Sequence, residues 1–95
     1  MLNATAPEPP KPGTVWGYVT DRKTSEPLVG GIVIVEGIEK GVATDIQGRY
    51  TIGPLRPGTY RVRVGYLAYN DQMRVVKVDS ISSRREDFRL EVTEN

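Results

Sequence analysis

A strict alternation of side chains near the middle of the chain is the feature that most constrains its fold. Residues 59–66 read TYRVRVGY, so an apolar or aromatic residue stands at every second position and a polar or small one between. A period of two places these two sets on opposite faces of a β-strand. We therefore predict a strand here and assign Tyr60, Val62 and Val64 to a hydrophobic core.

Two turns are predicted on the N-terminal side of this strand. In the stretch DIQG, Asp45 can accept backbone hydrogen bonds at the first position of a type I turn, and Gly48 suits the fourth. Pro57 and Gly58 predict a second turn, in which Pro presets φ and Gly adopts a positive φ. We assign structural turn roles to these four residues and expect both glycines to occupy positions that resist a β-carbon.

Strand-like patterns recur along most of the chain. The segments with such a pattern are residues 15–21, 32–35, 42–44, 50–52, 59–66, 72–78 and 87–92. Residues 32–35 and 72–78 carry apolar side chains at both parities, which favours burial on both faces or a crowded position, or a bulge in the second segment. Seven short strands punctuated by turns, without helical periodicity, predict an all-β fold, a seven-stranded Greek-key β-sandwich.

The composition fits one small domain with a polar N-terminal extension. The chain has 95 residues, 38% of them hydrophobic, with ten Gly and seven Pro. Four of the prolines fall in residues 1–13, which offer little apolar surface to bury and predict a Pro-rich flexible tether. We therefore divide the chain into the tether, a β-sandwich at 14–92, and a C-terminal tail at 93–95.

Several classes of function are disfavoured by the residue types present. The chain has no Cys and no His, which removes thiolate chemistry and the commonest general base and metal ligand. Its aspartates lack the close spacing of a calcium loop. The net charge of +1 gives no case for nucleic-acid or membrane-surface binding, and no apolar run approaches a membrane span. We predict no catalytic residues, no metal site, no cofactor and no direct membrane insertion.

Two aromatic residues on the first strand are the unusual feature of the sequence. If Val15, Gly17 and Val19 face the core, Trp16 and Tyr18 face outward. Large aromatic residues that point away from a core can mark a contact site. We assign them to a docking or ligand-stacking surface, with coverage by the N-terminal tether or by a tyrosine of a neighbouring strand as the alternative.

Taken together, these motifs resemble the carboxypeptidase regulatory-like domain family. The resemblance spans residues 15–90 and is carried by V-x-G-x-V-x-D from Val15 to Asp21, P-L-x-G from Pro27 to Gly30, V-x-V-x-G from Val33 to Gly37, G-x-x-T-D-x-x-G-x-Y-x-I from Gly41 to Ile52, L-x-P-G-x-Y from Leu55 to Tyr60, and F-x-L from Phe88 to Leu90. It implies a seven-stranded transthyretin-like, or prealbumin-like, β-sandwich. Modules of this family occur beside metallocarboxypeptidase domains, in surface proteins, and at the N-terminus of SusC-type TonB-dependent receptors.

The resemblance implies a non-enzymatic role. Among transthyretin-like folds, the hydroxyisourate hydrolases depend on histidines, which this chain lacks. The related surface modules that form isopeptide bonds need a Lys in the first strand and a Glu in the strand after the Pro-Gly turn, and neither is present. We expect a spacer, stabilising or docking module of a larger exported bacterial protein, with an outer-membrane TonB-dependent receptor as the expected parent.

The expected partners are neighbouring domains of the parent or another exported protein, and the oligomeric state stays open. The expected location is the periplasmic or cell-surface side of a bacterial outer membrane, although Met1 does not begin a signal peptide in this chain. The alternative is a carbohydrate- or peptide-binding module that uses Trp16 and Tyr18 as a stacking platform. An exposed, co-planar aromatic pair would favour that alternative, and a pair covered by the tether would favour the spacer, stabilising or docking module.

Overall fold

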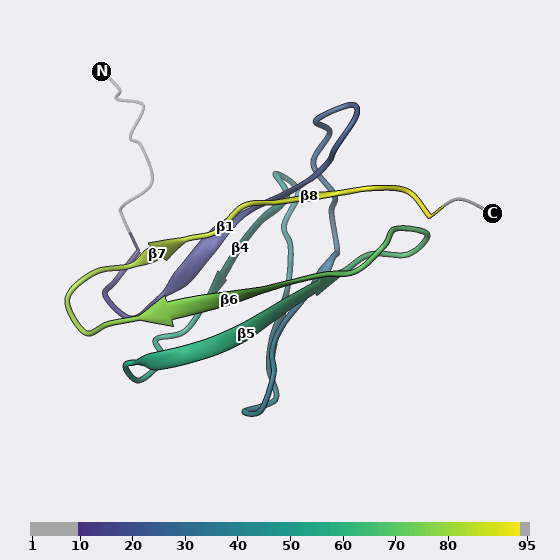
Figure 1. Cartoon of the computed structure of the whole chain (residues 1–95). Coiled ribbons are helices and arrows are strands. Elements are labelled where there is room, and N and C mark those ends of the chain that lie inside the picture. Colours follow the sequence, from purple (N-terminus) through teal and green to yellow (C-terminus); the bar gives the residue numbers. More distant parts are fainter. Residues whose placement is uncertain (1–9, 94–95) are drawn as a thin grey trace, which may run out of the picture.

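The computed structural model describes residues 10–93 and contains eight strands in two sheets (Figure 1). The strands are β1 (Val15–Asp21), β2 (Ile32–Val35), β3 (Lys40–Ala43), β4 (Arg49–Ile52), β5 (Gly58–Gly65), β6 (Gln72–Val78), β7 (Arg84–Arg85) and β8 (Phe88–Leu90). This confirms the predicted all-β sandwich, with β7 as an additional two-residue strand. The described residues form no helix, and so none that could cross a membrane. Most of the predicted tether lies outside the described residues.

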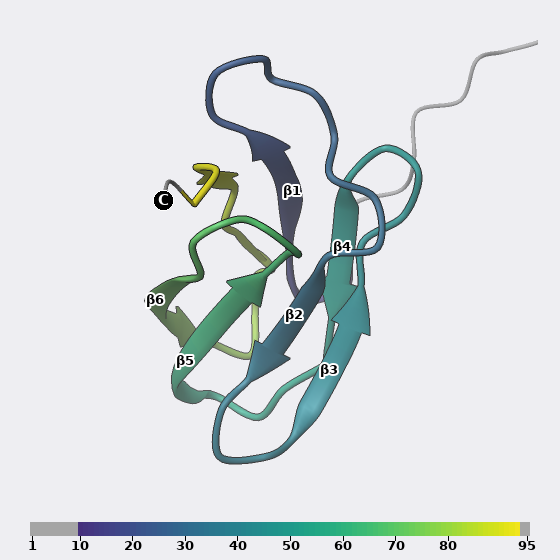
Figure 2. The same ribbon diagram turned by 90° about the vertical axis from the view of Figure 1, so that its right-hand side faces the viewer.

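One sheet, which we call the hairpin sheet, has the strand order β3-β2-β5-β6 (Figure 2). Neighbouring strands in this sheet are all antiparallel. Two of the three pairings, β2 with β3 and β5 with β6, join strands that are consecutive in the chain. The alternation in β5 fixes its orientation, since Val62 and Val64 are fully buried while Arg61 and Arg63 are exposed. The core assignment of these two valines is confirmed.

The other sheet, which we call the β1 sheet, is built around β1. Strand β4 pairs with one edge of β1 in antiparallel fashion, while β7 and β8 follow each other along its opposite edge in parallel. All of these partners lie far from β1 in the sequence. Parallel and long-range pairing of this kind cannot be joined by tight hairpins, so side chains must specify it.

The core fills the space between the two sheets. Its buried apolar residues are Val15, Val19, Leu28, Val33, Val35, Tyr50, Ile52, Leu55, Val62, Val64, Val76, Val78, Phe88 and Leu90. Tyr60 is only half-buried; its ring packs against this core and its hydroxyl donates to the Arg56 carbonyl at 2.6 Å. A tyrosine that bonds back to the chain just before its own strand fixes the corner between two strands.

The structure corrects the interpretation of the two segments that are apolar at both parities. On the outer face of the hairpin sheet, Ile32 is 48% exposed and Val75 is 57% exposed, so neither β2 nor β6 is covered on both faces. The β5–β6 ladder is unbroken from Gly58↔Val78 to Val64↔Gln72, so β6 contains no bulge.

Asp45 and Gly48 form the turn before β4. The Gly48 amide donates to the Asp45 carbonyl at 2.8 Å, and the Asp45 carboxylate accepts the amides of Gln47 and Arg49. Gly48 has φ of +75°, and a β-carbon there would stand 2.6 Å from the Val19 carbonyl oxygen. Gly48 therefore has both a conformational and a steric reason to be glycine.

Gly58 differs from the expectation. It is the first residue of β5, has no positive φ, and a β-carbon there would meet the Tyr60 ring at an ordinary 3.7 Å. The prediction that Gly58 resists a β-carbon is wrong. The reason is that the chain enters the β5 ladder directly after Pro57, so Gly58 pairs with Val78 as an extended residue.

Candidate functional site: the outer face of the β1 sheet

The edge of β1 that meets β7 and β8 has an unusual backbone arrangement around Gly17. A β-carbon on Gly17 would stand 2.0 Å from the Glu86 carbonyl oxygen, so this carbonyl passes directly over the glycine. There it accepts a hydrogen bond of 2.6 Å from the hydroxyl of Tyr50, which is 2% exposed. Burial first, and then the nearby carboxylates Glu86 and Asp87, raise the pKa of the Tyr50 hydroxyl, which therefore remains a donor.

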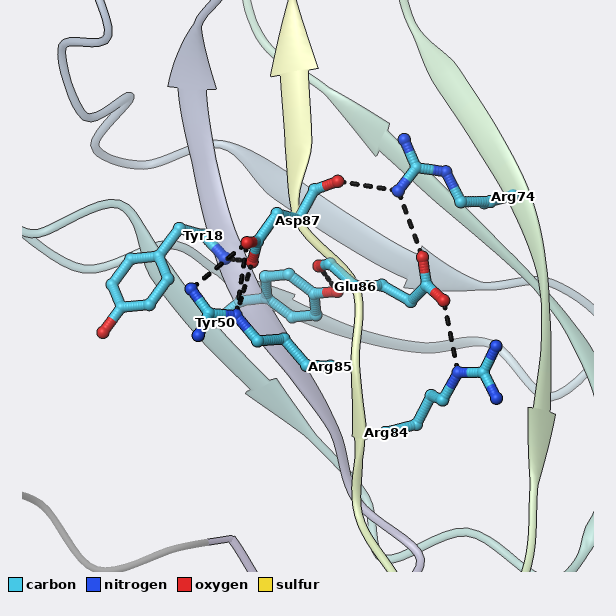
Figure 3. Close-up of polar contacts among 7 residues, drawn as sticks. All are labelled: Tyr18, Tyr50, Arg74, Arg84, Arg85, Glu86 and Asp87. Carbon is cyan, nitrogen blue, oxygen red and sulfur yellow. Dashed lines mark hydrogen bonds and ion pairs between the residues drawn. The ribbon is translucent and has the colours of Figure 1, made fainter.

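This arrangement places Asp87 on the outer face. Because the Glu86 carbonyl bonds to Tyr50, the Tyr18 amide bonds instead to the Asp87 carboxylate at 2.9 Å (Figure 3). The same carboxylate accepts the Arg85 side chain at 3.2 Å. A carboxylate thus replaces a backbone acceptor in the ladder and holds Arg85 beside the aromatic residues of β1.

Trp16 and Tyr18 lie where the sequence places them, on the outward side of β1, and both are half-buried. Their ring centroids are 6.4 Å apart, and the ring planes meet at 72°, an edge-to-face contact. The expected alternatives for this pair were a co-planar platform and a pair covered by the tether or by a neighbouring tyrosine. The pair is not co-planar, and within residues 10–93 two arginine side chains lie over its rings.

Two arginines approach Trp16 from the strands that flank β1. The Arg49 guanidinium, from β4, lies 5.0 Å from the centroid of the Trp16 ring, and the Arg85 guanidinium, from β7, lies 4.8 Å from it. Arg85 also lies 5.3 Å from the Tyr18 ring. We call Trp16, Tyr18, Arg49 and Arg85 the aromatic–arginine cluster.

Neither arginine of this cluster was predicted from the sequence to lie beside Trp16 and Tyr18. Their positions follow from the register, which pairs Tyr18 with Arg49 and Trp16 with Arg85. Because neighbouring residues of a strand point to opposite faces, the burial of Tyr50 implies that Arg49 points outward. No local signal in the sequence shows that these strands are neighbours of β1.

Glu86 points away from the cluster, toward the seam between the sheets (Figure 3). Its side chain is 13% exposed and contacts Arg74 of β6 at 3.1 Å and Arg84 of β7 at 3.3 Å. Arg74 also donates to the Asp87 carbonyl at 2.7 Å, and Gln72 donates to the Arg89 carbonyl at 2.7 Å. These side chains join the edge of the hairpin sheet to β8, so we assign them a structural role.

A second group of polar residues lies at the far end of β1. The Asp21 carboxylate accepts the Tyr69 hydroxyl at 2.5 Å and the amides of Thr24 and Lys23. The bond from Tyr69, followed by the backbone bonds, lowers the pKa of Asp21, and the same bond raises the pKa of Tyr69 to about 12. A pocket of about 400 Å³ lies beside Asp21, lined in part by Lys23, Asn70 and Thr93.

Neither group brings together the side chains of a metal site among residues 10–93. In the part of the chain that the structure describes, no three His, Cys, Asp or Glu side chains gather to hold a metal ion. Asp21 has its carboxylate oxygens engaged by a hydroxyl and turn amides, and Asp45 caps its own turn. The aromatic–arginine cluster is therefore the candidate functional site.

Comparison of the sequence with known families places this chain in one of them. Residues 14–91 match the carboxypeptidase regulatory-like domain. The chain belongs to this family. The search of curated protein sequences found no relative of this chain.

Several solved structures are similar to the regulatory-like domain. A chain of a type II cohesin–X–dockerin complex from Acetivibrio cellulolyticus has a TM-score of 0.57 and 23% identity, over 79% of this chain and 51% of its own. The Bacillus anthracis TIE protein has a TM-score of 0.72 and 18% identity, over 85% of this chain and 16% of its own. A putative carbohydrate binding protein from Bacteroides uniformis has a TM-score of 0.55 and 19% identity, over 83% and 41%.

These likenesses concern the fold alone. The regulatory-like domain spans about half of the cohesin–X–dockerin chain and smaller shares of the other two. In each of the three, the shared β-sandwich is therefore part of a longer chain.

Proposed function

We propose that this domain is a non-catalytic docking module of a larger exported bacterial protein, and that it docks through the aromatic–arginine cluster. The cluster itself is the observation that carries the proposal. Trp, Tyr and Arg are the residue types that dominate binding energy at protein interfaces, and here all three meet on one half-exposed sheet face. Their contacts with one another already order the side chains, which lowers the entropy lost on binding.

The parent that we propose is an outer-membrane TonB-dependent receptor, with the domain on the periplasmic or cell-surface side. Membership in the regulatory-like family supports this choice, since modules that resemble this one stand at the N-terminus of such receptors. The partner is then a neighbouring domain of the receptor or another exported protein. Nucleic acid is not a proposed partner.

Docking agrees better with the geometry than sugar stacking does. A sugar ring stacks on a flat aromatic surface, whereas Trp16 and Tyr18 meet edge to face at 72° and Trp16 already contacts two guanidinium groups. A sugar site also needs polar groups that converge on one position. We therefore expect no glycan binding by this face, and the test below includes a glycan.

Trp16 provides a direct test, because it is the only tryptophan of the chain. The domain is titrated with the adjoining domain of its parent protein while the tryptophan emission is recorded. We expect a saturable shift to shorter wavelength as Trp16 loses its contact with water. By calorimetry, Trp16→Ala should weaken binding at least about fivefold, as for a residue at the centre of an interface.

Leu67→Ala is the matched control, because Leu67 is 90% exposed on the loop between β5 and β6. It should leave binding unchanged. Binding that is insensitive to Trp16→Ala would contradict docking through this face. A saturable emission change with a neutral glycan would replace the docking function by the carbohydrate-binding one.

A further inference from the structure

The outer face of the β1 sheet carries an excess of positive charge, although the whole chain is nearly neutral. The register places Arg89 of β8 beside Thr20, on the same face as the cluster. With Arg49 and Arg85 this makes three arginines, against one carboxylate, Asp87, for a net of two positive charges. Arg22 and Glu91, at the end of the face, neutralise each other at 2.6 Å.

Two of these arginines have no carboxylate partner among residues 10–93. The described ion pairs include Arg85 with Asp87, but none of them involves Arg49 or Arg89. The Nε of Arg49 is buried and has no hydrogen-bond partner in the described part of the chain. Arg89 makes a long contact of 3.4 Å with a neutral acceptor, the Arg22 carbonyl.

The contact with Trp16 prepares Arg49 to bind a carboxylate. It restricts the orientation of the guanidinium, and neither terminal nitrogen of that group is engaged by a carboxylate among residues 10–93. A planar pair of donors matches the two oxygens of a carboxylate and binds them bidentately. The cluster therefore presents a fixed aromatic surface with arginine donors around it.

The outer face of the hairpin sheet is also positively charged but has a different character. Strand parity places Arg61, Arg63 and Lys77 on it, and Arg63 is paired with Glu36. Between these charges lie the exposed apolar side chains of Ile32, Ile34, Met73 and Val75. The β1 sheet differs because its arginines gather around an aromatic pair.

We propose that the outer face of the β1 sheet recognises an acidic segment of the partner protein, with Asp or Glu side chains that bind Arg49 and Arg89 while an apolar part contacts the portion of Trp16 that the two guanidinium groups leave exposed. This identification rests on the proposed docking function and specifies the chemistry of the partner. Complementary charge mainly sets which partner binds and how fast, and it weakens with salt.

The test uses a short capped peptide of alternating Glu and Thr, and a control peptide with Gln in place of each Glu. Trp16 emission is followed while each is titrated into the domain. We expect a saturable change with the Glu peptide alone. Binding should weaken when salt rises from about 0.1 M to about 1 M, because the screening length falls from about 10 Å to about 3 Å.

Charge-removing variants locate the site. Arg49→Gln and Arg89→Gln should each weaken binding of the Glu peptide at least about fivefold. Arg61→Gln is the matched control, an exposed arginine on the hairpin sheet, and should change binding by less than about twofold. Arg49 contacts Trp16, so its removal can perturb the fold; Arg89 is exposed, and its variant carries the test if Arg49→Gln is unstable.

Equal responses to the Glu and Gln peptides, or no response to either, would overturn the acidic partner. So would a response to an anionic polysaccharide, such as polygalacturonate, in the absence of one to the Glu peptide. These failures are separate from failure of docking: the adjoining domain could still bind through Trp16 with no dependence on salt, Arg49 or Arg89.

Discussion

The two sheets of this domain obtain their structure in different ways. The hairpin sheet consists of antiparallel strands, each paired with a strand next to it in the chain, and in its central strand β5 the alternating side chains show directly which residues are buried. The β1 sheet joins β1 to strands far along the chain, partly in parallel. Its assembly depends on a few residues with specific contacts, above all Gly17, Tyr50 and Asp87.

This difference shows how structure and recognition can be divided between the faces of a small sandwich. A regular ladder tolerates exchange of its outward residues, because burial and backbone bonds hold it. The β1 sheet uses an outward carboxylate, Asp87, both to complete its ladder and to orient Arg85. The candidate docking face is therefore coupled to the integrity of its sheet.

The largest effect is expected from Gly17→Ala in the β1 sheet. The added methyl would stand 2.0 Å from the Glu86 carbonyl oxygen and 2.8 Å from the Asp87 carboxylate, so the β7–β8 segment must move. The bonds from Tyr50 and Tyr18 to that segment would be lost with it. We expect a loss of more than about 3 kcal/mol of unfolding free energy in denaturant melts.

Gly41→Ala is the matched control for Gly17→Ala, since Gly41 lies in an exposed edge strand of the hairpin sheet. A β-carbon there would be 3.4 Å from the nearest atom, the Val33 carbonyl oxygen. We expect a change within about 0.5 kcal/mol. Equal effects at the two glycines would mean that the contrast between the sheets is wrong.

An intermediate effect is expected from Val62→Ala in the hairpin sheet. Val62 is fully buried between the sheets, so truncation removes apolar contact and leaves a small cavity. We expect a loss of roughly 1–3 kcal/mol with an unchanged m-value. Val75→Ala, on the outer face of the adjacent strand, should change stability by less than about 0.5 kcal/mol. The reverse order would show that the faces of this sheet are assigned backwards.

The smallest effect concerns the contact between Asp21 of β1 and Tyr69, and it depends on pH. The bond from Tyr69 lowers the folded pKa of Asp21 below its ordinary 3.8. The stability that the Asp21 carboxylate contributes is therefore present above pH 3.8 and is lost as pH falls through the folded pKa. The folded pKa of Tyr69 is raised from 10 to about 12, so its stabilisation is present below pH 10 and is lost as pH rises toward 12.

Tyr69→Phe removes the bond and should flatten both limbs of the pH–stability curve, measured by denaturant midpoints. Part of each limb should remain, because the amides of Ile81 and Ser82 also lower the pKa of Asp79 and burial raises the pKa of Tyr50. A curve that is unchanged at both ends would show that the Asp21–Tyr69 bond does not contribute to stability.

Local patterns in the sequence determined the strands and one turn. Alternation located β1 and β5 and separated their buried from their outward residues, because neighbouring side chains on one strand always point to opposite faces. The outward direction of Trp16 and Tyr18 followed from the same rule. Asp45 and Gly48 could be read because a tight turn is specified by adjacent residues.

The tertiary structure decided which strands are neighbours and therefore what surrounds each outward residue. Ile32 and Val75 look buried in an apolar run, yet only one face of each strand meets the other sheet. Gly58 resembles a turn glycine, yet it enters the ladder as an extended residue. Arg49 and Arg85 reach Trp16 only because β4 and β7 pair with opposite edges of β1. A two-residue period records the faces of a single strand, whereas the order and register of distant strands depend on how all of the side chains pack together.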